Sequence, residues 1–249
     1  MALRHASEWI ELDLTGAVQQ WMSAPEANHG LIMKAMGPVS VEYYLAGCDH
    51  SDIERRPQLV VRYSAATPTP TAPSSPTPTV VPAEPPTPTP TATSSRQILQ
   101  EGVAGYQGTS TTTLSAWEQT QNLSFLENIT VRTGGVRTGL LRFDLAGMPR
   151  GGILRSATLR LYTTGSSNPH GMHLQGYALR RPWAPEGATW LAPAAGLLWA
   201  APGAEGVPQD RARWPVFDVA VSPVGEWTEA DVTSAVRGWL ADPARNHGL

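Results

Sequence analysis

The sequence predicts an all-β protein: a jelly-roll-like antiparallel β-sandwich with one short helix per repeat, plus a disordered Thr/Pro-rich linker. Three observations lead to this fold class. Charged residues make up only 16% of the chain, whereas glycine and proline number 23 each, a composition typical of turn-rich β proteins. Short segments of alternating polar and apolar residues are separated by Gly/Pro turns. One stretch of sequence also occurs twice, on either side of a proline-rich segment.

The repeated stretch organises the whole chain. Residues 8–31 (EWIELDLTGAVQQWMSAPEANHGL) align without a gap with residues 226–249 (EWTEADVTSAVRGWLADPARNHGL), and more than half of the aligned positions are identical. Self-similarity of this extent indicates that one structural element is present twice. Each copy reads as the end of a strand followed by a short helix.

The helix is predicted from the spacing of apolar residues in the second copy. Val232, Val236 and Trp239 fall at i, i+4 and i+7, so they share one face of a helix. Either Asp231 or Thr233 is expected to cap its start by accepting a backbone N–H bond. These residues are interpreted as scaffold, because large apolar side chains at such positions are usually buried.

Strands are predicted from period-two alternation between turn signals. In residues 139–145, Leu141 and Phe143 share a face; in residues 153–162, Ala157, Leu159 and Leu161 do. The expected strands lie at residues 31–34, 39–45 and 58–63 before the linker and at 139–145, 153–162, 173–179 and 216–221 after it.

The linker occupies residues 67–95, which contain ten prolines and no aromatic residue. Proline fixes φ and removes a backbone donor, so this segment cannot join a sheet or a helix. We expect an extended tether of polyproline-II character. Such a tether keeps neighbouring modules apart.

Domain boundaries follow from the repeat and the linker together. Residues 1–66 read as the C-terminal part of a first β-sandwich domain, and residues 96–249 as the N-terminal part of a second, homologous one. Because an open sheet edge is costly, we expect residues 31–63 to complete the second domain in cis. The two helix copies would then compete for one position.

Several motifs occur in a defined order along the chain. They are LLRFDL at 140–145 with Pro149, ATLRLY at 157–162, WAPEGATW at 183–190 with Trp183, Glu186, Thr189 and Trp190, FDV at 217–219, the helix residues Asp231, Thr233 and Trp239, the turn at Asn246, and the closing segments 42–43 and 56–63. In this order and spacing the chain resembles the DNRLRE-type domain, which overlaps carbohydrate-binding module family 96 and the disaggregatase-related repeats.

The resemblance implies a jelly-roll-like sandwich in secreted or surface proteins of bacteria or archaea, part of which are linked to polysaccharide binding. It also implies that the motif residues are structural. The sequence departs from the family pattern at residues 111–114 (TTTL), where an acidic residue is expected, and at residues 46–49 (AGCD), which replace a more polar stretch.

Motifs of enzymes and metal sites are missing from the sequence. It contains no GxSxG, HExxH, GxxxxGK[ST] or strand-linked GxGxxG pattern. His170 and His173 have no evident third ligand, so we expect no metal site and no cofactor. A structural calcium ion would be compatible with the fold class, but no motif supports one. The lone Cys48 excludes an internal disulfide framework and is expected to be a buried, inert thiol.

Carboxylates are the candidate catalytic residues for a glycosidase, because glycoside hydrolysis needs two facing acids. Glu186, Asp218 and Asp231 all lie in the motifs above. Asp231 is more simply explained as a helix cap, and Glu186 as an acceptor for backbone N–H groups of its loop. No catalytic residue is therefore predicted.

Tryptophan is the more informative residue type, with nine tryptophans against three phenylalanines. Sugars present C–H faces that stack on indole rings, and the indole also offers an N–H donor. Outside the repeated and family motifs lie Trp117, Trp199, Trp214 and Tyr106. They are the candidate sugar-stacking residues; the alternative is burial beneath a long loop.

These observations favour a non-catalytic, extracellular carbohydrate-binding module in a secreted or cell-surface protein. Its expected partners are a polysaccharide or cell-surface glycan and neighbouring domains of the same longer chain. A net charge of -3 argues against nucleic acid, and no apolar run is long enough for membrane insertion. Two alternatives remain open: a structural spacer or adhesin-type repeat without a specific ligand, and an accessory part of a polysaccharide-degrading enzyme.

Overall fold

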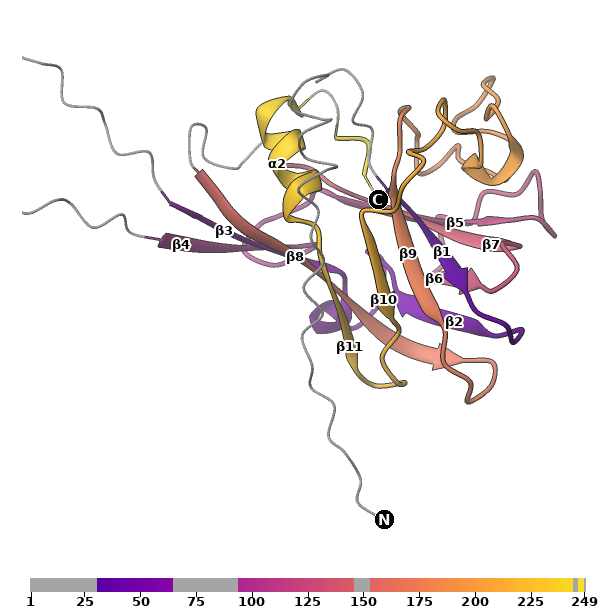
Figure 1. The fold of residues 1–249 in the computed structure, drawn as a ribbon, viewed down its shortest axis with the longest axis horizontal. Helices are drawn as coiled ribbons and strands as arrows, with labels where there is room; N and C mark the ends of the chain where they lie inside the picture. Colours follow the sequence, from indigo (N-terminus) through magenta and orange to yellow (C-terminus); the bar gives the residue numbers. More distant parts are fainter. Residues whose placement is uncertain (1–30, 65–93, 146–152, 244–245, 249) are drawn as a thin grey trace, which may run out of the picture.

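The computed structural model describes residues 31–64, 94–145, 153–243 and 246–248. They form antiparallel strands with one α-helix and two short 3-10 helices, which confirms the predicted all-β sandwich with a short helix (Figure 1). The first copy of the predicted helix and most of the predicted linker lie outside the described residues. Within the described part of the chain, no helix is long and apolar enough to cross a membrane.

The elements follow one another in a simple order. The strands are β1 (Leu31–Met36), β2 (Glu42–Ala46), β3 (Gln58–Ser64), β4 (Ser94–Gln100), β5 (Thr109–Ser115), β6 (Asn128–Arg132), β7 (Arg137–Phe143), β8 (Ile153–Ser166), β9 (His173–Ala178), β10 (Phe217–Ala220) and β11 (Trp227–Asp231); the helices are η2 (Ile53–Arg55), η3 (Pro202–Ala204) and α2 (Thr233–Ala241). Because β4 begins at Ser94, the last two residues of the predicted linker are strand.

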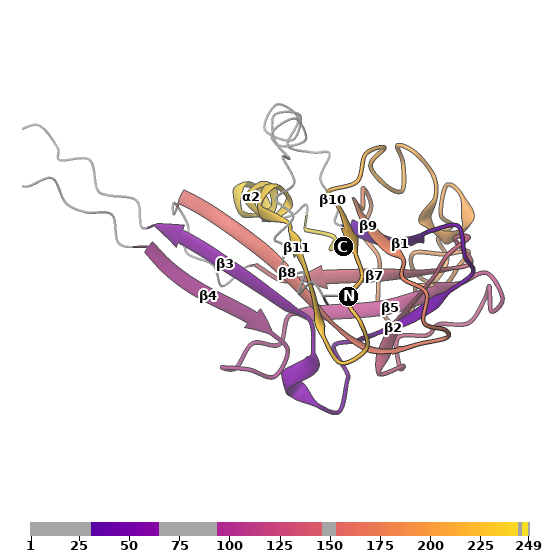
Figure 2. The same ribbon diagram turned by 60° about the horizontal axis from the view of Figure 1, so that its bottom comes forward.

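Strand β8 connects the two parts of the sheet. It has 14 residues; its first part pairs with β3 on one edge, its middle with β11 on the other, and its end with β2. The strand order is β10-β9-β1-β7-β6-β2-β8-β3-β4, with β11 on β8 and β5 on β7. The sheet therefore curls on itself, with β3, β4 and β8 toward one end and β1, β7 and β9 toward the other (Figure 2).

Strands from both sides of the predicted linker alternate in this sheet. β1 lies between β7 and β9, β2 between β6 and β8, and β3 between β8 and β4. Their apolar side chains enter the same core: Met33, Leu45, Leu59 and Val61 all have an exposed fraction of 0%. Residues 31–64 and the segment that starts at Ser94 are thus parts of one folded unit.

The core confirms the faces predicted from alternation. Leu141 and Phe143 of β7 are buried in the main cluster, and so are Ala157, Leu159 and Leu161 of β8. A smaller cluster lies beneath the long connection between β9 and β10; it contains Ile32, Leu114, Leu140, Leu179, Trp183, Ala188, Trp199 and Ala204.

Helix α2 packs on β8 with its predicted stripe inward (Figure 1). Val232, Val236 and Trp239 are fully buried. Val232 occupies the N-cap position and makes no side-chain capping bond, so neither residue predicted as the cap is the N-cap. The Asp231 carboxylate accepts the N–H of Thr233, the first helical residue, at 2.8 Å. The hydroxyl of Thr233 instead accepts the N–H of Ala157 at 2.6 Å, which fastens the helix to β8.

Strand β5 was not predicted, because its sequence TSTTTLS is polar. All seven of its residues pair with β7. The hydroxyl of Thr111 accepts the N–H of Cys48 at 3.1 Å, and that of Thr113 accepts the N–H of Thr130 at 2.9 Å. Buried threonines are suited to a strand when their hydroxyls find partners. The threonine run at residues 111–113 is therefore part of the fold.

Candidate functional site

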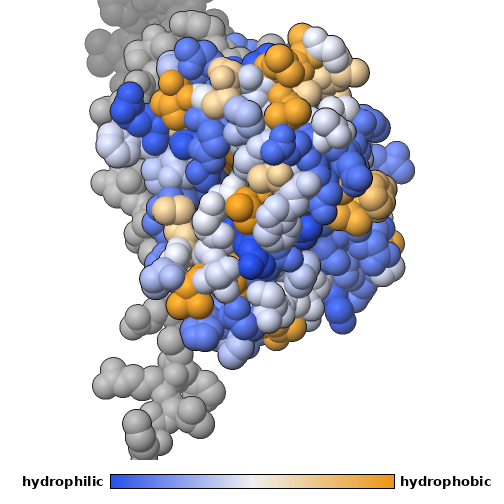
Figure 3. All heavy atoms as spheres, turned by 90° about the vertical axis from the view of Figure 1, so that its right-hand side faces the viewer, coloured by the Kyte–Doolittle hydropathy of each residue, from blue (hydrophilic) through white to orange (hydrophobic). Residues whose placement is uncertain are grey.

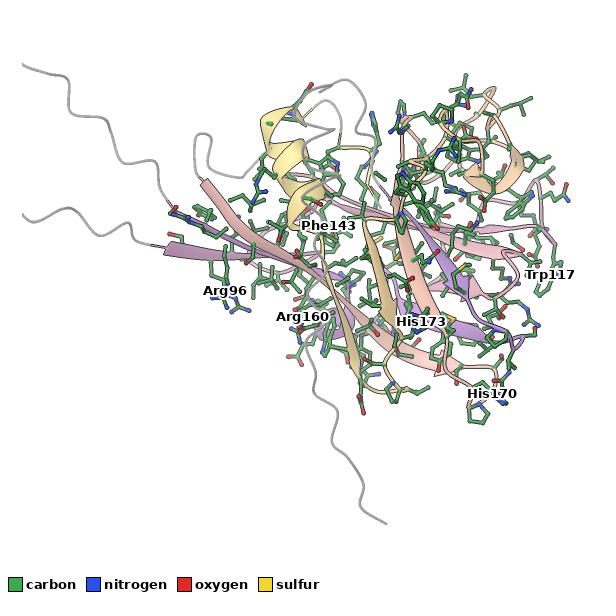
Figure 4. All side chains as sticks on the ribbon, in the orientation of Figure 1. Arg96, Trp117, Phe143, Arg160, His170 and His173 are labelled. Carbon is green, nitrogen blue, oxygen red and sulfur yellow. The ribbon has the colours of Figure 1, made fainter. Side chains whose placement is uncertain are left out.

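The candidate site is centred on Trp117, in the loop 116–127 between β5 and β6. Its side chain is 57% exposed and lies at one end of the molecule (Figure 4). The guanidinium carbons of Arg132 and Arg137 lie 5.2 Å and 5.0 Å from the centre of the ring. These two arginines are directly opposite each other on β6 and β7, so they project from the same face of the sheet. Both guanidinium groups thus lie over the indole ring, and more than half of the Trp117 side chain stays exposed.

The carboxylate of Glu42 forms ion pairs with both arginines. Glu42 of β2 is only 5% exposed, and its oxygens lie 3.4 Å from Nη1 of Arg137 and 3.7 Å from Nη1 of Arg132. The hydroxyl of Tyr44 also donates to Glu42, at 2.8 Å. This hydrogen bond is the largest cause of a raised pKa of Tyr44. A carboxylate this deep needs such partners, because an unpaired buried charge is costly.

A second carboxylate, Glu118, follows Trp117 in the loop. It lies 3.6 Å from Nη2 of Arg137 and accepts a hydrogen bond from the hydroxyl of Ser115. We call the set Trp117, Arg132, Arg137, Glu42 and Glu118 the Trp117 platform. Two guanidinium groups face two carboxylates, so the formal charge of the platform is zero.

The loop that carries the platform is held in place by hydrogen bonds. Asn122 donates through Nδ2 to the carbonyl oxygens of Pro185 and Ala188, at 2.6 Å and 2.7 Å. Its Oδ1 accepts the hydroxyl of Ser124 at 2.7 Å. Asn122 therefore ties this loop to the long connection between β9 and β10, and the platform does not depend on ordering the loop when a ligand binds.

Two exposed apolar residues of the same loop were missed by the sequence analysis. Phe125 is 73% exposed and Leu126 36%. The signal was an apolar pair inside a polar loop, NLSFLEN. The end of the molecule that carries Trp117 is otherwise mainly hydrophilic, with hydrophobic groups separated from one another (Figure 3).

The other predicted sugar-stacking residues divide into one exposed and two covered side chains. Trp214 is 72% exposed, in the loop before β10. Trp199 is 5% exposed, and its N–H donates to the carbonyl oxygen of Thr189 at 2.9 Å, so its ring cannot serve as a surface platform. Tyr106 packs against the main core and donates to the carbonyl oxygen of Asp144 at 3.0 Å. Trp199 is thus buried, whereas Tyr106 is half-buried.

The tryptophans of the WAPEGATW motif are covered. Trp183 is 4% exposed, and its N–H donates to the carbonyl oxygen of His247. Trp190 packs against the smaller core cluster. Its ring is so close to Gly203 that a side chain at that glycine would overlap it. Thr189 accepts the N–H of Ala192 through its hydroxyl at 3.1 Å.

The repeated turn is also seated on the core. The side-chain amide of Asn246 donates to the carbonyl oxygen of Phe143 in β7. Next to it, a side chain at Gly248 would overlap the backbone of Leu141 and Arg142. Trp239 completes this region as a fully buried side chain.

Glu186 does not brace its loop as expected: it is exposed, and the carboxylate that accepts N–H groups in this connection is that of Asp210. Asp210 is fully buried and accepts from Ala200, Ala201 and Gly206 at 3.0 Å, 3.0 Å and 3.1 Å. A carboxylate in this position satisfies three backbone donors that the irregular loop cannot pair internally.

The histidines and the cysteine have local partners. His173 lies 2.9 Å from Asp218, and His170 lies 3.1 Å from Asn168. Among the described residues, no group of three His, Cys, Asp or Glu side chains could hold a metal ion. Cys48 is buried, and burial raises the pKa of its thiol.

Comparisons of the chain with protein-family models, with curated proteins and with solved structures found no match. Any function of the Trp117 platform must therefore be inferred from the contacts of its own residues.

Proposed function

We propose that this chain is a non-catalytic, extracellular carbohydrate-binding module, and that the Trp117 platform binds a polysaccharide or cell-surface glycan. The observation that carries the proposal is an indole that is 57% exposed and lies within cation–π distance of two arginines. An exposed aromatic ring normally loses area by folding back onto the protein. Here the arginine pair holds it outward.

The geometry suits the faces of a sugar ring. Pyranose C–H groups pack on the open face of an indole, while the indole N–H, the arginines and Glu118 offer donors and an acceptor at its rim. Because the formal charge of the platform is zero, neutral sugars fit it better than acidic ones.

Other partner classes fit less well. An apolar protein interface would have to bury the charged groups around Trp117 without replacing their partners, which is unfavourable. A nucleic acid would meet a chain with a net charge of -3. The sequence resemblance to carbohydrate-binding module family 96 supports the same proposal.

A spacer or adhesin-type repeat without a specific ligand is the second candidate. The Thr/Pro-rich segment 67–95 favours it, because a tether is useful whether or not a module binds sugar. An accessory part of a polysaccharide-degrading enzyme would use the same platform to hold the enzyme on its substrate.

Binding of the full chain to a panel of neutral and acidic polysaccharides distinguishes these candidates. Affinity electrophoresis and pull-down on insoluble glycans should give retention on at least one neutral polymer. Trp117→Ala should lower this affinity about tenfold, the worth of one stacking contact of about 1.4 kcal/mol. Trp214→Ala removes the other exposed indole among the sugar-stacking candidates, and parental binding by this variant would assign the binding to the Trp117 platform. Retention that is unchanged by Trp117→Ala would refute the platform, and no retention on any polymer would favour the spacer.

A further inference from the structure

The ends of strands β3 and β4 are neighbours in the sheet. Ser64, the last residue of β3, pairs with Ser94, the first residue of β4. A two-residue turn is enough to join antiparallel strands at such a point. The chain instead connects them through residues 65–93, and ten prolines lie between Thr67 and Ser95. The connection is therefore far longer than a hairpin requires.

The three strands before this connection are deeply inserted in the rest of the fold. Each of β1, β2 and β3 lies between two strands that come later in the sequence. They contribute fully buried side chains to the main cluster, among them Met33, Leu45 and Leu59. Without them, the strands that follow Ser94 would keep several unpaired edges and an open core. Residues 31–64 thus act as an insert, and the described residues from Ser94 onward act as its acceptor.

The repeat shows where the insert enters. Leu31, the first residue of β1, pairs with Leu141. Gly248 lies against Leu141 and Arg142. In the alignment of the repeated stretch, Gly248 corresponds to the position immediately before Leu31. The second copy of the repeat therefore ends where the insert begins, as if the chain continued from Gly248 into β1. At its β1 end the insert therefore contacts the acceptor without being directly joined to it by a peptide bond.

We propose that residues 31–64 are exchanged between copies of this chain, so that the insert of one copy completes the acceptor of another. The contacts are the same within one chain and between two chains. The outcome depends on the connection alone, which sets the effective concentration of the insert at its own acceptor. A Thr/Pro-rich segment favours extended conformations, and these oppose the tight reversal that the adjacent ends of β3 and β4 require.

Exchange has two products. Reciprocal exchange closes a dimer, whereas one-way exchange continues from copy to copy and forms a head-to-tail array. Either product displays several Trp117 platforms along proline-rich tethers. The proposal concerns assembly only, so it holds or fails independently of glycan binding.

The test is to refold the full chain from denaturant at a series of protein concentrations and to measure masses by sedimentation velocity. Exchange is bimolecular and closure within one chain is unimolecular, so a tenfold higher concentration should raise the dimer-to-monomer ratio about tenfold. In the matched control, an Asn-Gly turn replaces residues 65–93 and joins Ser64 directly to Ser94. This variant should remain monomeric under the same conditions.

A disulfide reporter shows whether the dimer uses the exchanged strands. Val60 and Thr158 are partners in the register of β3 and β8. Val60→Cys, Thr158→Cys and Cys48→Ser are combined in the full chain and, separately, in the short-turn variant. The short-turn variant should form the bond within one chain, which verifies its geometry. The dimer of the full chain should form it between two chains, as seen on a non-reducing gel.

Two results would overturn the proposal. The first is a full chain that stays monomeric at every concentration, or that dimerises no more than the short-turn variant. The second is a dimer whose disulfides all lie within single chains, because that dimer would use another surface.

Discussion

Leu59 of β3 and Leu159 of β8 lie directly opposite each other, and both side chains are fully buried. Leu59 precedes the proline-rich segment and Leu159 follows it. Their contact joins the insert to its acceptor at the centre of the main cluster. Substitutions at this pair therefore measure how much the packing of residues 31–64 against the rest of the fold contributes to the free energy of unfolding.

Leu59→Ala and Leu159→Ala are each expected to lower the free energy of unfolding by about 2–5 kcal/mol, because each leaves a cavity in the core. The double variant should lose less than the sum of the two, by about 0.5 kcal/mol or more, since the residues are neighbours. Urea denaturation followed by tryptophan fluorescence gives these values. Arg62→Ala, at an exposed position of the same strand, should change stability by less than about 0.5 kcal/mol. Additive losses would show that the two segments are not packed together.

Asp210→Ala is expected to destabilise the fold by about 3 kcal/mol or more, because three backbone N–H groups lose a charged acceptor inside the protein. The comparison is Glu186→Ala, which removes an exposed carboxylate from the same connection. Thermal unfolding of both variants provides the measurement. Equal melting temperatures for the two would contradict the role given to Asp210.

Tyr106 predicts a loss of stability at alkaline pH. Burial raises the pKa of its phenol well above the ordinary value of about 10. Above pH 10 the unfolded chain releases this proton while the folded chain keeps it, so the stability present below pH 10 falls as the pH rises. In Tyr106→Phe the slope of unfolding free energy against pH should be shallower above pH 10. An unchanged slope in that variant would exclude Tyr106 as a cause.

Arg137→Ala tests how the Trp117 platform is supported. It removes one of two cations from the buried Glu42 and one of two supports from the indole. We expect a destabilisation of about 1–3 kcal/mol and a glycan affinity as low as that of Trp117→Ala. Addition of Glu42→Gln should recover part of the stability, because the unpaired charge is gone, but none of the binding. If both properties recovered, Arg137 would matter only through Glu42.

Much of the fold could be predicted from alternation alone. Residues 157–161 and 141–145 carry apolar side chains at every second position, and those side chains are buried as expected. Strand β5 escaped detection because the threonines at positions 111–113 look polar in sequence. The burial of Thr111 and Thr113 depends on the hydroxyl partners Cys48 and Thr130, which only the tertiary structure supplies.

The site was less predictable for a related reason. Trp117 and Trp199 look alike in sequence, because both lie outside the repeated motifs and between strands. Trp117 is held outward by Arg132 and Arg137, whereas Trp199 is covered by the connection that Asp210 organises. Both outcomes depend on residues distant in sequence, so no local pattern could have separated them.

The position of β1, β2 and β3 between later strands also sets an order for folding during translation. These strands leave the ribosome before every strand that flanks them, up to β9 at His173–Ala178. The apolar side chains of β1 and β2 must therefore remain without a sheet neighbour until β6 and β7 have emerged, whereas β3 can pair with β4 sooner. During that interval a nascent chain on a polysome has neighbours at the same stage, and early contact between them favours aggregation or pairing over solitary closure.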